Sequence, residues 1–177
     1  MDKNLILRRG FDSSLIAAGE DKKLVENLVA LNAKANNYGL TITESIAREI
    51  AVSRNEALIE NERFETNSDA IARLTSAFLQ TRYIEQDDFA ATMGEIINLF
   101  YLIKNEIEDE LSDDELIREM LKVFTETCFG SVELMESKGL EKILRKYNFF
   151  KDHKIWDDYE NTNWEDYYDL QDESWRE

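Results

Sequence analysis

The sequence predicts an all-α fold, a single bundle of about five to seven helices followed by an acidic, aromatic-rich C-terminal tail. Apolar residues recur at helical spacing in nearly every segment, and no segment alternates with the period of two that is typical of a strand. In addition, the 177 residues include no proline and only six glycines. Strand-rich folds usually contain both residues at their turns, so their scarcity favours helices joined by short turns.

Three helical segments are predicted in the N-terminal half. The first carries an apolar stripe at i, i+4, i+7 and i+11, which consists of Leu24, Leu28, Leu31 and Ala35. Tyr38-Gly39 predicts the end of this helix. Thr41 and Glu44, three residues apart, predict a capping box that opens the second helix.

The next two helices are predicted from their apolar faces. The inward residues of the second helix are expected to be Ile46, Ala47, Ile50, Ala51, Ala57 and Leu58. A third helix is expected near residues 68–81, with Ile71, Leu74, Ala77 and Phe78 on one face.

The fourth predicted helix is the best defined, and we expect it to run from about residue 87 to about residue 110. Its heptad-like seam consists of Phe89, Met93, Ile96, Phe100, Ile103 and Ile107. Ser112 and Glu115 predict a second capping box, and acidic residues in the first turn suit the positive end of the helix dipole. This capping box opens a fifth helix, whose inward residues are expected to be Leu116, Met120, Val123 and Phe124.

A break is predicted after the fifth helix, at Cys128-Phe129-Gly130. A sixth helix follows over about residues 131–147 and is expected to be interrupted at Gly139. The chain therefore divides into a helical bundle domain, residues 1–154, and an acidic aromatic tail, residues 155–177.

Several observations predict a cytoplasmic protein. No apolar run approaches the roughly 18 residues of a membrane span. The first residues lack the apolar stretch and cleavage site of a secretory signal. Cys128 is the single cysteine, which excludes an intrachain disulfide and suits a reducing compartment.

The tail combines acids and aromatics at high density. Residues 155–177 carry nine acids and one base, so their net charge of −8 is almost half of the −17 for the whole chain. Burying aromatics while keeping a negative face outward is typical of a recognition segment. The candidate partner-binding residues are Trp156, Tyr159, Trp164, Tyr167, Tyr168 and Trp175. Two competing interpretations are that the tail packs on the bundle itself, near the basic pair Arg8 and Arg9, and that the tail is disordered.

The negative charge also bears on partners. A surface of this sign repels phosphate backbones, which argues against nucleic acid, and nothing indicates a membrane partner. It would steer the chain toward a basic protein, although solubility alone is an alternative explanation.

Four stretches of sequence resemble a known family. They are YGLTITE at 38–44 ahead of Arg54-Asn55, TRYIEQDDF at 81–89, FYLIKNEIEDELSDDELIREM at 100–120 and CFGSVEL at 128–134. In that order and spacing they resemble a family of small bacterial proteins known only as a domain of unknown function. The resemblance covers about residues 11–147 and leaves out the tail. It implies a bacterial, cytosolic, helical domain, and it supplies no catalytic residues.

The residue types argue against most enzyme classes. The single histidine, His153, excludes a multi-histidine metal site within one chain. The glycine-rich phosphate loops and the nucleophile elbow are missing, and we expect no cofactor. Cys128 could act as a nucleophile only with His153 as its base, and a buried small hydrophobe is the alternative interpretation of this cysteine.

The densest charge cluster of the bundle spans the end of the predicted fourth helix and the turn after it. The weak candidates for a carboxylate-held divalent cation are Glu106, Asp109, Glu110 and Asp113. Their spacing is not that of a calcium loop, and a solvated helix end with a capping box explains most of it. Asn105 is expected to make a structural hydrogen bond, with a ligand as the alternative partner.

The leading functional hypothesis is a non-catalytic protein–protein interaction module. One alternative is an acidic inhibitor, such as an immunity-type protein, that binds a basic partner. The other is an enzyme whose metal is held by carboxylates between Glu106 and Asp114. The sequence leaves the oligomeric state open.

Overall fold

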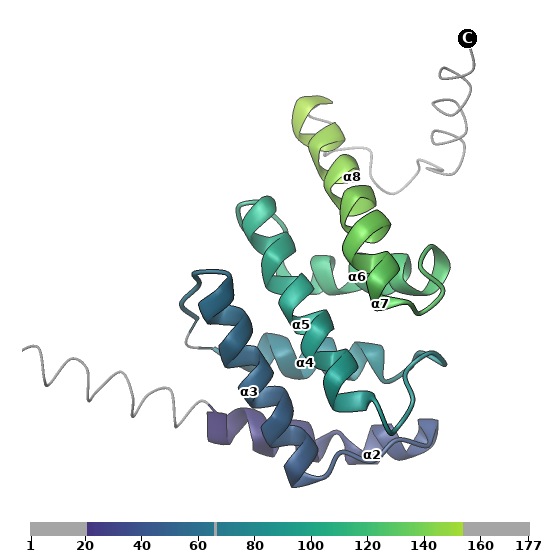
Figure 1. The fold of residues 1–177 in the computed structure, drawn as a ribbon. Coiled ribbons are helices and arrows are strands. Elements are labelled where there is room, and N and C mark those ends of the chain that lie inside the picture. The colour runs from purple at the N-terminus through teal and green to yellow at the C-terminus, as the bar shows by residue number, and fades with distance from the viewer. Residues whose placement is uncertain (1–20, 66, 154–177) are drawn as a thin grey trace, which may run out of the picture. The chain divides into compact units, whose positions relative to one another are not determined.

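The computed structural model describes residues 21–65 and 67–153. Within these ranges every regular element is a helix and none is a strand, which confirms the all-α prediction (Figure 1). Backbone contacts divide the chain into two units, Met1–Leu144 and Arg145–Glu177.

The first described element is a helix over residues 21–30, followed by the short helices α2 (Asn32–Ala35) and η1 (Asn36–Tyr38). Leu24, Leu28 and Ala35 are fully buried, as their spacing predicts, whereas Leu31 is only half-buried. Gly39 ends the segment with φ of +74°, a left-handed conformation that suits glycine. The predicted end at Tyr38-Gly39 is therefore confirmed.

Helix α3 (Glu44–Glu60) buries Ala47, Ile50, Ala51, Ala57 and Leu58, as predicted, whereas Ile46 is only half-buried. Helix α4 (Asp69–Phe78) buries its predicted residues Ile71, Leu74 and Phe78, and leaves Ala77 half-buried.

The predicted capping box of Thr41 and Glu44 is wrong. Thr43 is the N-cap of α3, because its backbone is extended and its hydroxyl accepts a hydrogen bond from the Ile46 N–H at 3.2 Å. Thr41 lies outside the helix, and its backbone N–H and C=O are both bonded by the Gln86 side chain.

Helix α5 (Phe89–Glu106) lies against α3, and their contact is the most extensive among the helices labelled in Figure 1. All six residues of the predicted seam are buried. The helices approach closely at Gly94, where a Cβ would stand 2.8 Å from the Ser53 hydroxyl oxygen. The helix is shorter than predicted, because Glu108 and Asp109 both adopt positive φ after its last turn.

Helix α6 (Asp113–Glu126) packs against α4 and α5. Its predicted capping box is confirmed: Ser112 accepts from the Glu115 N–H, and the Glu115 carboxylate accepts from the Ser112 N–H at 2.9 Å. The break at Cys128-Phe129-Gly130 is also present, and Gly130 has a φ of +84°.

The last predicted helix consists of three pieces, α7 (Val132–Leu134), the π-helical turn η2 (Met135–Gly139) and α8 (Leu140–His153). The interruption expected at Gly139 takes the form of this π turn. A Cβ on Gly139 would lie 2.7 Å from the Met135 sulfur and 3.1 Å from the Cys128 sulfur. Glycine thus allows the turn to pack on the core.

Candidate functional site

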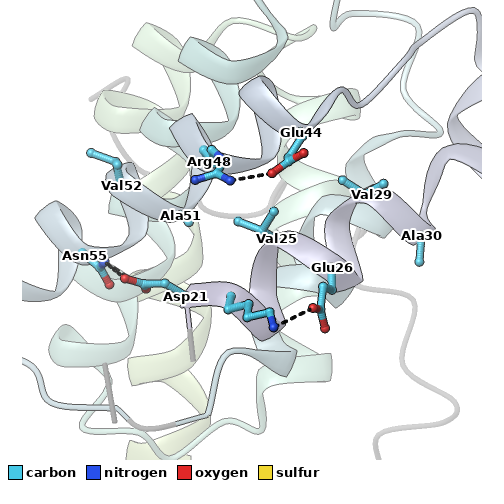
Figure 2. A pocket seen from close by; sticks show the side chains of 11 residues that line it. Asp21, Val25, Glu26, Val29, Ala30, Glu44, Arg48, Ala51, Val52 and Asn55 are labelled. Carbon is cyan, nitrogen blue, oxygen red and sulfur yellow. Dashed lines mark hydrogen bonds and ion pairs between the residues drawn. The ribbon is translucent and has the colours of Figure 1, made fainter. Parts of the chain in front are cut away.

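The described residues contain a groove of about 1080 Å³ between helix 21–30 and α3, which we call the apolar groove (Figure 2). Its apolar lining consists of Val25, Val29, Ala30, Ala51 and Val52. Its polar lining consists of Asp21, Lys22, Glu26, Glu44, Arg48 and Asn55. Val52 is 55% exposed, so a large part of its side chain is available to a ligand.

Two asparagines fix the walls of the apolar groove. At one end the Asn55 side-chain amide donates to both carboxylate oxygens of Asp21 at 3.0 Å, as Figure 2 shows. Beyond the other end, the Asn32 side chain bonds both the N–H and the C=O of Ile42 at 2.7 Å. Because residue 21 meets residue 55 and residue 32 meets residue 42, the two walls run antiparallel.

Charged side chains on the rim of the apolar groove form solvent-exposed ion pairs. Lys22 and Glu26 lie 3.8 Å apart on one wall, and Arg48 pairs with Glu44 on the other (Figure 2). All four side chains are more than half exposed. Exposed pairs of this kind contribute about 0–1 kcal/mol, so a ligand can exchange their partners at little cost.

A second, smaller groove of about 270 Å³ lies on the other flank of α3, and we call it the acidic groove. Its carboxylates are Glu56 and Glu60 of α3, Glu95 of α5 and Glu136 of η2. No lysine, arginine or histidine is among its lining residues. Within residues 21–65 and 67–153, none of these four carboxylates forms an ion pair.

Helix α3 therefore separates an apolar groove from an acidic one. Val52 and Asn55 line the first, while Ser53 and Glu56 line the second. This surface was not predicted from the sequence, because the apolar periodicity identifies only the inward face of the helix. The available signal was Val52 and Ile59, two apolar residues seven apart on the outer face, of which Ile59 is 78% exposed.

The predicted cation candidates lie in a different place, at the C-terminal end of α5. There the Lys104 ammonium lies 2.8 Å from an Asp113 oxygen, 3.1 Å from a Glu65 oxygen and 3.6 Å from an Asp109 oxygen. The structure thus brings Asp109 and Asp113 together on a lysine, and it leaves Glu106 and Glu110 exposed. In the part of the chain that is described, no group of three His, Cys, Asp or Glu side chains is placed to hold a metal ion.

Arg63 joins the same network from the turn after α3. Its guanidinium donates to Glu65 at 2.8 Å and to Asp109 at 2.7 Å. It also donates to the Asn105 side chain at 2.7 Å, and the Asn105 amide donates to the Asn61 carbonyl at 2.8 Å. The structural hydrogen bond expected for Asn105 is confirmed. We call Lys104, Arg63 and the carboxylates of Glu65, Asp109 and Asp113 the Lys104 network.

The charges of the Lys104 network shift several pKa values. Burial alone would lower the pKa of Lys104, but its hydrogen bonds to Asp113 and Glu65 outweigh burial and raise it. Burial alone would raise the pKa of Asp109, whereas the hydrogen bond and charge of Arg63 lower it overall. Burial, with a smaller contribution from Glu65, raises the pKa of Tyr101 to about 12.

Cys128 is buried, and its sulfur lies 4.0 Å from the Met135 sulfur. Burial raises the pKa of its thiol, which disfavours the reactive thiolate. Its proposed base, His153, has no described side chain, so the pairing of the two is outside the described residues.

The tail residues predicted to bind a partner, Trp156, Tyr159, Trp164, Tyr167, Tyr168 and Trp175, also lie outside the described residues. Their role stays a prediction. Among the described helices, none has the length and apolar character needed to cross a membrane.

Comparison with known proteins gives one match. A family model described as "Family of unknown function (DUF6323)" matches residues 27–153, which is more than half of the chain. The match includes all of α3 and α5. It therefore contains every lining residue of the acidic groove and, in the apolar groove, the lining residues from Val29 onward. No curated protein and no solved structure matches the chain.

Proposed function

The chain belongs to this family of unknown function, and we propose that it is a non-catalytic interaction module whose apolar groove binds an amphipathic helix of a partner protein. The observation that carries the proposal is the groove itself, an open concave surface with an apolar lining and a charged rim. Amphipathic helices bind in grooves of this composition through side chains at i, i+3, i+4 and i+7.

The dimensions of the groove support a helix as the ligand. Its lining extends from residue 21 to residue 30 on one wall and from residue 44 to residue 55 on the other. At 1.5 Å per residue these stretches are about 14 Å and about 16 Å long, which corresponds to about three turns of a bound helix. Three turns present three or four anchoring side chains on one face.

Burial of the valines would supply part of the binding free energy. Val52 is 55% exposed, and Val25 and Val29 are half-buried. Covering the exposed half of one such side chain contributes about 1 kcal/mol. A charge at Val52 would instead face an apolar ligand surface without a partner, so Val52→Asp is expected to weaken binding at least about tenfold.

The experiment that tests the proposal places the photo-crosslinker p-benzoylphenylalanine at Val52 in the full-length chain, in cells that express it. The matched control places it at Phe129, which is 69% exposed and lines neither groove. We expect a discrete heterologous product from position 52 and none of the same mass from position 129. Mass spectrometry of the crosslinked peptide should map to an amphipathic helix, and binding of that protein should be lost in Val52→Asp.

Two other products would contradict the proposal. A crosslink to a second copy of the chain would make the groove a self-association surface. A crosslink within one chain, to residues 1–20 or 155–177, would make a segment of the chain itself the occupant.

A further inference from the structure

We infer that the partner helix is cationic, and that the acidic groove binds its basic side chains while the apolar groove holds its apolar face. The inference deepens the proposed function and rests on it. It names the chemistry of the partner, which the apolar groove alone does not specify.

The two grooves include residues on successive turns of α3. Val52 lines the apolar groove, and Glu56, one helical turn later, lines the acidic groove. Residues at i and i+4 have Cβ atoms about 5–6 Å apart, a distance that a lysine or arginine side chain can bridge. Glu60 follows after one more turn. A helix seated on Val52 therefore has carboxylates within reach of its flank.

Four carboxylates from three helical elements line one hollow in the acidic groove. On the rim of the apolar groove Glu26 and Glu44 have bases beside them, and Glu65, Asp109 and Asp113 lie around Lys104. The four glutamates of the acidic groove have no such base among the described residues. Like charges around one hollow repel each other, and a bound cation relieves that repulsion.

The spacing of the carboxylates favours side-chain cations over a metal ion. No group of three described carboxylates converges closely enough to hold a metal ion. Such loosely spaced acids suit several ammonium or guanidinium groups on long side chains, each of which can reach one carboxylate. The partner fitted by both grooves is a protein helix with one apolar face and a flank of lysine or arginine.

The test uses two synthetic amphipathic peptides of about 18 residues, long enough for five turns. Both carry leucine at i, i+3, i+4 and i+7, and their polar positions are all lysine in one and all glutamate in the other. Each is labelled with a fluorophore, and its Kd for the full-length chain is measured by anisotropy at about 50 mM and about 300 mM NaCl, because screening separates charge from apolar contact. We expect the lysine peptide to bind at least about tenfold more tightly than the glutamate peptide at low salt.

Two triple variants isolate the acidic groove from the net charge of the chain. In Glu56→Gln/Glu60→Gln/Glu95→Gln we expect the lysine peptide to bind about fivefold more weakly at low salt, with a smaller loss at high salt. The matched control, Glu85→Gln/Asp87→Asn/Glu108→Gln, removes as many exposed carboxylates, none of which lines either groove. It should change the Kd less than about twofold.

The outcomes separate the inference from the proposed function. Equal effects of the two triple variants, or equal binding of the two peptides, would overturn the cationic partner. If Val52→Asp still abolished binding in that case, the apolar groove would stand as a docking site. If Val52→Asp left binding of both peptides unchanged, the proposed function would fail as well. Circular dichroism checks that each variant is folded. If the triple variant loses helicity, the Kd of the lysine peptide is measured for Glu95→Gln alone.

Discussion

Lys104 shows how one side chain can hold three segments together. It extends from α5 to Glu65 in the turn after α3, to Asp109 after α5 and to Asp113 at the start of α6. Its side chain is only 10% exposed, so these contacts form in an environment that water screens weakly. A buried charge of this kind is stabilising only while its partners are in place.

Lys104→Met tests this dependence. The substitution keeps much of the side-chain volume but removes the ammonium group that Glu65 and Asp113 share, and leaves each of these partly buried carboxylates with a single arginine, Arg63 or Arg73. We expect the free energy of unfolding to fall by about 2 kcal/mol, measured by urea denaturation. Lys122→Met is the matched control, because Lys122 and Glu126 form an exposed pair, and it should cost less than about 0.5 kcal/mol. Equal losses in the two variants would mean that the Lys104 network adds nothing beyond a surface pair.

Asp109 provides a pH-dependent prediction. Its pKa in the folded state is below the ordinary value of 3.8, so its contribution to stability is present above about pH 4 and is lost as the pH falls through the folded pKa. Asp109→Asn should therefore be less stable than the wild type at pH 7, and the difference should close below about pH 4. Asparagine tolerates the positive φ of 58° at this position, so backbone strain does not confuse the comparison. Chemical denaturation at several pH values checks this, and a difference independent of pH would contradict it.

At the same scale, sequence periodicity predicts which residues are buried but not how polar ones are satisfied. Arg54 occupies an inward position of α3 and is 3% exposed. Its guanidinium donates to the Glu65 carbonyl, eleven residues away. The partners of Lys104 likewise come from other segments. Such pairings depend on tertiary placement, which a pattern within one helix does not contain.

The helices themselves were predicted well where a long apolar seam defines them, and less well at their ends. The seam of α5 is buried as expected, yet the helix stops at Glu106. Asp109, in the turn that follows, is bound by Arg63 from a distant segment, which stabilises a backbone that local propensity disfavours. At α3 the capping box was predicted at Thr41, but Thr43 is the N-cap, and the Gln86 side chain bonds Thr41 outside the helix.

Two glycines with positive φ allow a prediction about turns. A Cβ on Gly130 would stand 2.2 Å from the Cβ of Tyr83, whereas a Cβ on Gly39 meets nothing within 4 Å. Gly39→Ala should therefore cost only the strain of a left-handed alanine, about 1 kcal/mol. Gly130→Ala carries that strain plus a clash with another segment, and should cost at least about 3 kcal/mol. Thermal and urea unfolding of both variants measure the difference. Similar losses of unfolding free energy would show that the backbone after α6 shifts to accommodate the added methyl group.

At the scale of the whole molecule, composition predicted the fold class and an overall charge of −17, but not where on the surface that charge is unpaired. Both grooves depend on the packing of α3 against helix 21–30 on one flank and against α5 on the other. That packing brings together residues from three separate segments. A single sequence could identify the acidic aromatic tail as unusual, but it could not identify a groove.

The tail nevertheless contributes to the last prediction through its charge. Residues 155–177 carry −8 of the −17, so a chain that ends at residue 154 has a net charge of −9. This cut falls just beyond the family match at residue 153. Long-range attraction accelerates the approach of a cationic ligand, whereas contacts in the bound state set the dissociation rate. With the lysine peptide at about 50 mM NaCl, truncation should slow association severalfold and leave dissociation unchanged.

Stopped-flow kinetics on the full-length and truncated chains, both checked for helicity by circular dichroism, distinguish the two roles considered for the tail. A slower association alone means that the tail acts through its field and that the grooves make the contacts. A faster dissociation would instead mean that Trp156, Trp164 or Trp175 touches the ligand, as the sequence-based hypothesis of a recognition tail requires. Loss of helicity on truncation would place the tail in the folded core and contradict the division of the chain at residue 154. Raising the salt to about 300 mM should abolish the difference in association rate but not a difference in dissociation rate, because screening removes the field and leaves direct apolar contacts intact.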